Sequence, residues 1–404
     1  MLRPNGQPRL ARIVEAVARR KPSNASASCF CVSTFGTNMA SMRCGDVWEL
    51  RPYRLALSEP YRWAKGENAQ RQGLLVRCVL GGAVGFGEVA PPPNLGMPLE
   101  VRRAAEAVLL ALRAVCSREA AWALLDAPEL GSRVRCGFAT ALLAAEAAAA
   151  ALPLRHYLVA CDRLEALQGK GARDKILVNG LLTDREPATL ARHAETLAAE
   201  GLTTLKIKCG ADDALDAARV AAVRAALPSA ALRLDANEAW SADPLRYFRA
   251  FAPFKPAYIE QPLNASATPG ELAAAAREAP CPVFLDESAS AWTVIETLLD
   301  AGAGAGIVLK PQRLGGPDRT LSVAVQLAAR GTPYVITNSL ESAVGLWATA
   351  QTAAAAPALA LPCGLATARY FGSDLAAPPK LVSGELLLNQ TPGLGAEGSW
   401  EGVP

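Results

Sequence analysis

The amino-acid sequence predicts an α/β fold, a modified (β/α) TIM-type barrel with an α+β capping domain formed by the N-terminal region and the C-terminal tail. Two observations predict the barrel. Short runs rich in Ile, Val and Leu alternate with helical stretches, a pattern typical of buried parallel strands. Each run ends in charged residues, which recur every 24 to 27 positions, about the length of one strand, one helix and two loops. The runs are LKIKCG (205–210), LRLDAN (232–237), YIEQP (258–262), VFLDES (283–288) and GIVLKP (306–311).

The charged residues at these five strand ends form a candidate site. In a closed barrel the carboxyl ends of the strands share one rim, where catalytic groups converge. Each residue alone also has a structural interpretation: strand lysines can extend to solvent, and Asp286 or Ser288 can cap a helix. Five charged strand ends at equal spacing favour a site. The set contains Lys206, Lys208, Asp235, Glu260, Asp286 and Lys310.

The three acids in this set predict a metal ion. Asp235, Glu260 and Asp286 would lie on adjacent strands, where carboxylates repel one another unless a cation lies between them. Oxygen ligands favour a hard ion, and three carboxylates leave coordination positions for water and a substrate oxygen. We therefore expect Mg²⁺.

The segments before and after these strands complete the fold. Residues 73–80 and 83–89 form a hairpin, because Gly81-Gly82 supplies the positive φ angles that a tight turn needs. Helices are expected at 98–125 and 133–151, the second alanine-rich and suited to close packing. The other expected barrel elements are a first strand at 176–182, its helix at 187–199, a seventh strand at 334–338 and an eighth at 364–369.

We therefore divide the chain into four parts. Residues 46–155 are the capping domain, 170–372 the barrel, and 373–404 a tail that returns to the cap. Residues 1–45 are rich in Arg and Ser with Glu15 as the sole acid, a composition typical of a transit peptide. A disordered leader, or a start at Met39 or Met42, is the alternative. A transit peptide would place the protein in the plastid stroma; otherwise we expect the cytoplasm.

Composition excludes several classes of function. The 404 residues carry a net charge of +3 without a basic stripe, so nucleic-acid binding is not expected. Only two histidines, His156 and His193, leave lysine as the favoured acid/base. The ten cysteines are scattered, which favours reduced thiols in a reducing compartment. No apolar run approaches the roughly 20 residues of a membrane span. The expected partner is a small-molecule carboxylate; the sequence leaves the oligomeric state open.

The strand-end motifs resemble the muconate-lactonising branch of the enolase superfamily. The shared features are the KxK pair, DxN, EQP, DES and the later lysine. Within that branch, TNSLES (337–342) followed by Gly345-Leu346 is similar to o-succinylbenzoate synthases, especially those of cyanobacteria and algae. The resemblance covers roughly residues 47–389. Dipeptide epimerases, N-acylamino-acid racemases and muconate cycloisomerases share the same five positions.

This resemblance implies a Mg²⁺-dependent syn dehydration. The substrate would be 2-succinyl-6-hydroxy-2,4-cyclohexadiene-1-carboxylate and the product 2-succinylbenzoate, in phylloquinone or menaquinone biosynthesis. Lys208 would remove the α-proton and protonate the departing hydroxyl, Lys310 would hold the ring by cation–π attraction, and Lys206 would be an auxiliary cation. A lysine base with Mg²⁺ is a known property of this superfamily. We expect neighbouring positive charge to lower the pKa of Lys208.

Further site residues are expected around this core. Asn237 and Glu287 would orient the ligands of the metal. Ser339 and the backbone at Gly315 and Gly316 could receive the succinyl carboxylate, or be ordinary loop residues. Residues 58–66 are interpreted as a surface turn or, from the resemblance, as a mobile loop with Arg62 or Lys65 near a substrate carboxylate.

Two rival functions stay open. A racemase of N-acylamino acids or an epimerase of dipeptides would use both lysines as bases on opposite faces of the substrate. Dipeptide epimerases usually carry an acidic DxD-type clamp after the eighth strand, whereas residues 366–370 here read ATARY and Asp374 follows alone. A barrel that has lost activity and serves as a binding protein is the other rival, which the intact spacing disfavours.

The leader prediction can be tested by truncation. If residues 1–45 are a targeting segment, a chain that begins near Cys44 will fold and turn over substrate like the full chain, because the first cap strand starts only at about Val47. Circular dichroism and steady-state assays compare the two forms. An insoluble or inactive truncated protein would show that the segment belongs to the fold.

Overall fold

The computed structural model describes residues 47–64, 66–93, 96–210 and 212–396. The leader predicted for residues 1–45 lies outside these ranges. The transit peptide, and the plastid location that depends on it, therefore stay predictions.

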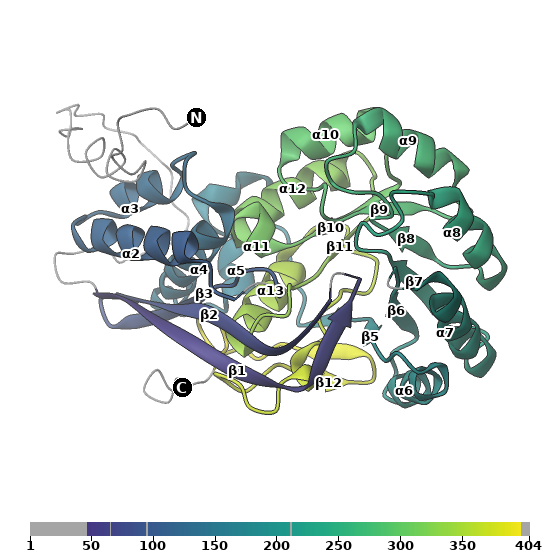
Figure 1. Ribbon diagram of the computed structural model, residues 1–404. Helices are drawn as coiled ribbons and strands as arrows, with labels where there is room; N and C mark the ends of the chain where they lie inside the picture. Colours follow the sequence, from purple (N-terminus) through teal and green to yellow (C-terminus); the bar gives the residue numbers. More distant parts are fainter. Residues whose placement is uncertain (1–46, 65, 94–95, 211, 397–404) are drawn as a thin grey trace.

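A parallel sheet of seven strands forms the barrel, with the order β11-β10-β9-β8-β7-β6-β5. The sheet curls so that its strands surround a common interior, which confirms the predicted fold class (Figure 1). All five strands predicted between residues 204 and 316 are present. The strands are β5 (Gly180–Leu182), β6 (Thr204–Lys208), β7 (Ala231–Asp235), β8 (Tyr258–Glu260), β9 (Val283–Leu285), β10 (Gly306–Leu309) and β11 (Tyr334–Ile336).

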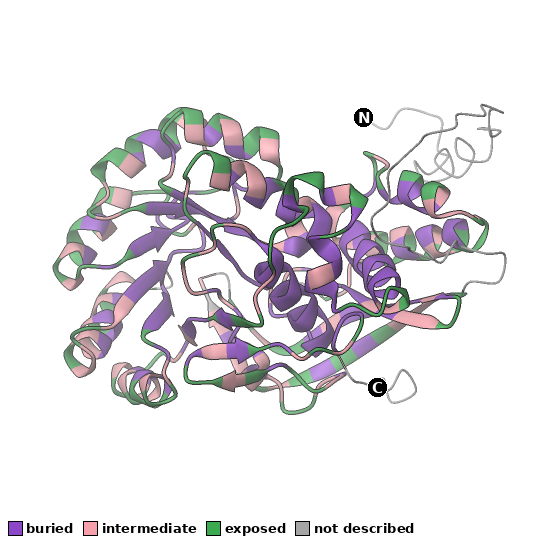
Figure 2. Cartoon of the chain, turned by 180° about the vertical axis from the view of Figure 1, so that it is seen from behind, coloured by how far each residue is buried: buried purple, intermediate pink, exposed green. Residues whose placement is uncertain are grey.

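Helices cover the outside of this sheet, and their caps agree with the sequence. α9, for example, begins with a capping box between Thr268 and Glu271 and with Pro269 in its first turn. Figure 2 shows the strands buried and the outer helix faces exposed. The helices are α6 (Pro187–Ala199), α7 (Asp213–Ala226), α8 (Pro244–Phe251) with η2 (Ala252–Phe254), α9 (Pro269–Glu278), α10 (Trp292–Asp300), α11 (Pro311–Leu314), α12 (Pro317–Ala329) and α13 (Ala343–Ala355).

The cap combines an antiparallel sheet of order β1-β2-β3 with helices on one side of it (Figure 1). Alanine-rich α4 lies directly on β3: a Cβ added to Gly85 or Gly87 would come within 2.1 Å of helix backbone oxygens. The predicted close packing is thus confirmed. The elements are β1 (Val47–Trp63), β2 (Gly66–Leu80), β3 (Ala83–Val89), α2 (Leu99–Arg113), α3 (Arg118–Leu125), α4 (Ser132–Ala149), α5 (Leu154–Leu158) and η1 (Asp162–Leu167).

Two predicted cap elements need correction. Residues 58–66, interpreted as a loop, largely continue β1, which pairs with β2 as far as Trp63↔Gly66 with one irregularity between Ala56 and Tyr61. Polar residues are tolerated there because most described residues of this part of the hairpin are exposed or half-buried. The single helix predicted at 98–125 is two helices, since the Ser117 side chain accepts a hydrogen bond from Ala120 N and starts α3.

The first barrel strand is also divided. β4 (Lys175–Leu177) pairs with β13 (Glu385–Leu387), which continues the tail hairpin from β12 (Lys380–Val382), whereas β5 pairs with β6. The predicted strand is therefore interrupted at residues 178–179, between β4 and β5. The tail also reaches the cap side, because Gly393 bridges Pro153 just before α5.

The eighth strand predicted at 364–369 is replaced by single bridges. Cys363 pairs with Val178 and Gly364 with Thr337, and residues 368–370 form η3 (Ala368–Tyr370). The Arg233 side chain holds this seam, donating to Asn179 Oδ1 at 2.8 Å and to Pro362 O at 2.7 Å. Side-chain bonds thus supplement the short backbone pairing. No helix within the described ranges is long and apolar enough to cross a membrane.

A buried arginine joins the cap to the barrel. Arg135 of α4 is fully buried and binds both oxygens of Asp318 on α12, at 2.9 and 2.7 Å, and the carbonyl of Gly315 at 2.6 Å. It also contacts Asp126 at 2.7 Å. Asp318 is itself only 5% exposed, so the pair neutralises charge away from solvent.

Replacing this arginine will destabilise the protein. Arg135→Met leaves Asp318 with Arg163 as its remaining cation, and breaking a buried pair costs about 3 kcal/mol or more of unfolding free energy. Urea denaturation measures the loss. Arg102→Met removes an exposed ion pair with Glu106 and is the control, with an expected cost below about 0.5 kcal/mol. Equal losses of unfolding free energy in the two variants would show that Arg135 does not hold the cap against the barrel.

Candidate active site

Strand register brings the predicted residues together inside the barrel. Lys208, Asp235 and Glu260 are successive register partners on β6, β7 and β8. Lys206 lies two residues before Lys208 on the same face of its strand. Beneath this row lies a small apolar cluster, in which Tyr258 and Phe284 stack at 4.1 Å, with buried Arg233 over the Tyr258 ring. The polar site therefore lies at the carboxyl end of the strands, as expected.

Two lysines contact the first two carboxylates. Lys206 Nζ lies 2.7 Å from Asp235 Oδ2 and 2.6 Å from Glu260 Oε1. Lys208 Nζ lies 2.5 Å from Asp235 Oδ2 and 2.9 Å from Asn237 Oδ1. Both carboxylates are fully buried. Asp235 is consequently shared between two ammonium groups.

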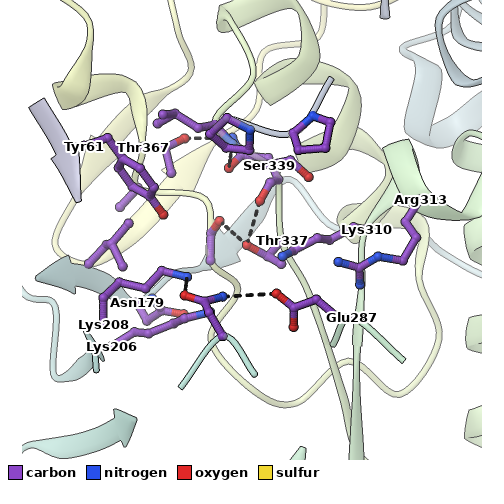
Figure 3. A pocket seen from close by; sticks show the side chains of 18 of the residues that line it. Tyr61, Asn179, Lys206, Lys208, Glu287, Lys310, Arg313, Thr337, Ser339 and Thr367 are labelled. Atoms are coloured by element: carbon purple, nitrogen blue, oxygen red, sulfur yellow. Dashed lines mark hydrogen bonds between the residues drawn. The ribbon is translucent and has the colours of Figure 1, made fainter. Parts of the chain in front are cut away.

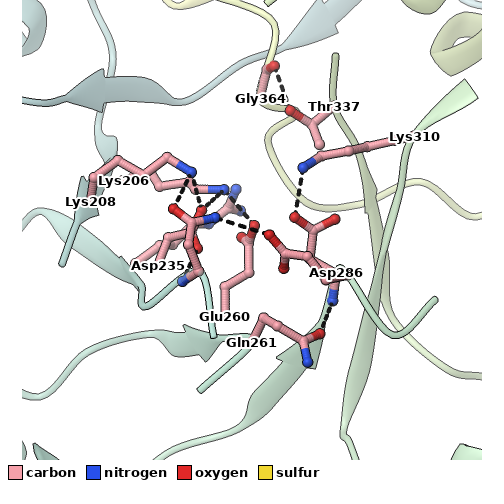
Figure 4. A network of polar contacts seen from close by, with 12 residues as sticks. Lys206, Lys208, Asp235, Glu260, Gln261, Asp286, Lys310, Thr337 and Gly364 are labelled. Carbon is pink, nitrogen blue, oxygen red and sulfur yellow. Dashed lines mark hydrogen bonds and ion pairs between the residues drawn. The ribbon is translucent and has the colours of Figure 1, made fainter. Parts of the chain in front are cut away.

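The third carboxylate is held from the opposite side. Asp286 contacts Lys310 Nζ at 2.6 Å and Arg313 Nη1 at 2.5 Å. The buried amide of Gln261 fixes its backbone, because Gln261 Oε1 accepts from Asp286 N at 2.9 Å and Ser288 N at 3.2 Å. Figure 4 shows Lys206 and Lys208 facing Lys310 with the three carboxylates between them.

The expected lowering of the Lys208 pKa is not found in this arrangement. Burial alone would lower it, but the negative charge of Asp235 outweighs burial and raises the pKa above its ordinary value. The same balance raises the pKa of Lys206, with Asp235 and Glu260 as the opposing charges. The prediction considered the neighbouring lysine and a metal ion, whereas the carboxylate in direct contact dominates here.

The pKa of each carboxylate depends on the charged groups around it. Burial raises the pKa of each, but Lys206 and Lys208 reverse this for Asp235, and Arg313 and Lys310 reverse it for Asp286. Both therefore stay ionised. For Glu260 the contact with Lys206 is outweighed: burial and the charge of Asp235 raise its pKa to about 8.

The site has the right residues for a hard divalent cation. Three carboxylates with 0% exposure end adjacent strands, and buried carboxylates require positive charge nearby. In the described part of the chain, however, no three His, Cys, Asp or Glu side chains converge as a metal centre. Each carboxylate is turned toward a lysine or arginine, so these cations engage the oxygens that a metal would use.

A cavity of about 350 Å³ lies above the carboxylates. Lys206, Lys208, Asn237, Glu287, Lys310 and Ser339 all line it, and Figure 3 shows the lysine pair and Lys310 entering from opposite sides. Asn237 links the wall together, donating from Nδ2 to Glu287 Oε1 at 3.2 Å. Lining residues that sequence reasoning did not identify include Tyr61, Arg133, Asn179, Arg313, Thr337, Asn338 and Thr367.

Three proposed substrate contacts lie away from the cavity lining. Arg62 forms an exposed ion pair with Glu67 at 3.0 Å. The backbone N–H groups of Gly315 and Gly316 both donate to Pro311 O, at 2.8 and 2.9 Å, so they have no free donor for a carboxylate. Gly315 instead ends α11 and Gly316 begins α12, where their positive φ angles of 102° and 129° suit a sharp turn.

The sequence held a signal for some of the missed residues. Arg313 follows Lys310 by three positions, and one short helical turn returns it to the same rim. Thr337 and Asn338 end the predicted seventh strand. Tyr61 and Arg133 belong to the cap, and nothing in their local sequence shows that they reach the barrel.

Fold and site together define a barrel protein with paired lysines over buried carboxylates. Residues 189–402, just over half of the chain, match the model of the family described as enolase C-terminal domain-like. The chain belongs to this family.

Two relatives with known names give a more specific similarity than the family model. The chain is 38% identical over 214 residues to an o-succinylbenzoate synthase of Thermobifida fusca, which covers 52% of this chain and 65% of the relative. It is 37% identical over 222 residues to an o-succinylbenzoate synthase of Mycobacterium ulcerans, with 53% and 64% covered. The match thus spans less than two thirds of the length of each relative. Over the matched residues, the resemblance to o-succinylbenzoate synthases that the motifs indicated is confirmed.

Solved structures share the fold. The L-Ala-D/L-Glu epimerase of Bacillus subtilis aligns with a TM-score of 0.78 at 23% identity, over 87% of this chain and 98% of that one. A muconate lactonizing enzyme of Pseudomonas fluorescens aligns with a TM-score of 0.78 at 24% identity, over 90% and 98%. Identities this low support the shared architecture alone.

Proposed function

We propose that the protein is a Mg²⁺-dependent o-succinylbenzoate synthase. It would dehydrate 2-succinyl-6-hydroxy-2,4-cyclohexadiene-1-carboxylate to 2-succinylbenzoate, a step of menaquinone or phylloquinone biosynthesis. The observation that carries the proposal is the opposition of Lys208 and Lys310 across a cavity floored by three buried carboxylates. The proposed reaction is the one for which the relatives are named.

Asp235, Glu260 and Asp286 would hold the cation. When bound, it supplies positive charge beside the substrate carboxylate and offsets the Asp235 charge that otherwise raises the Lys208 pKa. Asn237 would then keep Lys208 oriented, since its Oδ1 accepts from Nζ at 2.9 Å while its amide nitrogen is tied to Glu287.

The dehydration needs one base on one face of the ring. Neutral Lys208 takes the proton from the carbon that bears the ring carboxylate. The electron pair forms the new ring double bond as the C–O bond to the hydroxyl breaks, and the proton on Lys208 passes to the departing oxygen to give water. Lys310, on the other side of the cavity, places its ammonium group against the ring.

The structure weighs against dipeptide epimerisation. Such a reaction needs an acid near the substrate ammonium group, and the wall after β11 presents Ala366 and Thr367 to the cavity. Asp374, the nearest acid in sequence, accepts instead from Ala343 N at 2.8 Å and Leu375 N at 2.6 Å. N-acylamino-acid racemisation is the stronger rival, because two lysines on opposite sides suit a two-base reaction.

Removing one carboxylate will test the cation site. Asp286→Asn should weaken Mg²⁺ binding and turnover by about 100-fold, because a neutral amide is a poorer ligand for a hard ion. Calorimetric titration with Mg²⁺ gives a readout that does not depend on turnover. Asp300→Asn, on exposed α10, is the control and should bind Mg²⁺ normally. Near-normal Mg²⁺ dependence in Asp286→Asn would show that Asp286 is not a ligand of the cation.

The two lysines separate the synthase from the racemase. In the dehydration Lys208 makes both proton transfers, so Lys208→Ala should abolish aromatic product while Lys310→Arg, which keeps a cation near the ring, retains part of the activity. In a racemase Lys310→Arg should stop reaction of one enantiomer but leave Lys208 able to exchange the α-proton of the other.

Both variants are assayed on the cyclohexadiene carboxylate and on an N-succinyl amino acid in D₂O. Formation of 2-succinylbenzoate is followed by its aromatic absorbance and deuterium incorporation by NMR. Stereospecific exchange on the amino acid, with no aromatic product from the diene, would overturn the synthase proposal while leaving the fold and the carboxylate site standing.

A further inference from the structure

The cavity carries more positive charge than its carboxylates account for. Five cationic side chains line it against a single carboxylate, Glu287. Four of the five are paired with the buried acids below. Lys206 and Lys208 contact Asp235, while Lys310 and Arg313 contact Asp286. Arg133 is the fifth.

Arg133 lacks an acidic partner. It lies in the first turn of α4, where the cap meets the barrel, and its Nη1 donates to the carbonyl of Ala90 at 3.1 Å. Within the described ranges it forms no ion pair with any carboxylate. Burial, together with the nearby charges of Arg313 and Arg71, lowers its pKa to about 10. It remains protonated at neutral pH, so an anion beside it would be strongly favoured.

Arg313 extends this positive end of the cavity. Its Nη1 is engaged by Asp286, and α11, which carries it, packs against α4. Arg133 and Arg313 thus bring positive charge from the cap and the barrel to one side of the cavity. In Figure 3 Arg313 lies on the side of Lys310, away from Lys206 and Lys208.

We infer that Arg133 binds a second carboxylate of the substrate, so that the site selects dicarboxylates. One carboxylate lies toward the buried acids and lysines, and the other, on a flexible arm, reaches the cap. This rests on the proposed function and replaces Gly315 and Gly316 as the receivers of the succinyl carboxylate, since their N–H groups are already bonded. A guanidinium is well suited to this role because it binds a carboxylate through two parallel hydrogen bonds.

The test compares two ligands that differ only at the arm. 2-Succinylbenzoate ends its arm in a carboxylate, and 2-butanoylbenzoate ends it in a methyl group. Both are titrated calorimetrically into the full chain with Mg²⁺ present. The variants are Arg133→Met and Arg133→Lys, and the control is Arg113→Met. Arg113 is also a cap arginine that donates to a backbone carbonyl, Trp48 O at 2.9 Å, but it lies outside the cavity lining.

Arg133→Met should weaken binding of 2-succinylbenzoate by about 10- to 100-fold, the effect of one lost charge-assisted hydrogen-bonding partner. Binding of 2-butanoylbenzoate should change by less than about twofold, which also shows that the variant is folded. Arg133→Lys should recover part of the loss, because it keeps the charge without the planar fork. Arg113→Met should keep the wild-type preference.

The outcomes separate this inference from the proposed function. A protein that dehydrates the diene, but whose Arg133 variants keep the wild-type preference between the two ligands, overturns the inference and leaves the function standing. A protein that does not dehydrate the diene, yet loses its preference for the dicarboxylate in Arg133→Met, supports the site and overturns the function. A wild-type protein without that preference overturns the inference.

Discussion

The structure depends on neutralising three carboxylates that are completely buried at the ends of adjacent strands. Uncompensated, each would cost several kcal/mol. Lys206, Lys208 and Lys310 lie within 2.7 Å of them and offset that cost. The backbone at the strand ends adapts to the same need. Asn237 and Gln261 adopt positive φ angles of 43° and 39°, unusual for residues other than glycine, and both direct their amides to the site.

The cap is tied to this arrangement by buried polar contacts. Glu88 on β3 accepts from Tyr53 and from Ser342 and Gly345 at the start of α13, close to the loop that carries Ser339. Gln312, between Lys310 and Arg313, donates to Glu88 O at 2.7 Å and accepts from Ala90 N at 3.2 Å. Cap strands therefore fix the barrel segments that present Lys310 and Arg313. A change in the cap can alter the site without touching a reacting group.

The barrel and the cap contribute different kinds of charged group to the cavity. The barrel pairs each of the three lysines that line the cavity with an acid, which suits proton transfer and cation binding at a fixed point. The cap contributes Arg133, which forms no ion pair within the described ranges, and the aromatic ring of Tyr61, which packs against Tyr370 at 5.6 Å. Reaction chemistry is thus concentrated in the strands, and recognition of the rest of the substrate falls to the junction between cap and barrel.

The sequence by itself determined the barrel, its five charged strand ends and the cavity residues Asn237, Glu287 and Ser339. Strand period and repeat length are local properties of the sequence, and they fix which side chains share a rim of the barrel. Only the tertiary structure decided the rest. The division of the first strand depends on a tail some 200 residues later in the chain, and the raised pKa of Lys208 depends on direct contact with Asp235 from the next strand. Arg133 and Tyr61 reach the cavity because the cap docks on the barrel, and Gly315 and Gly316 leave it because Arg135 and Pro311 bind their backbone. Contacts between segments far apart in the chain leave no trace in the local pattern of residues.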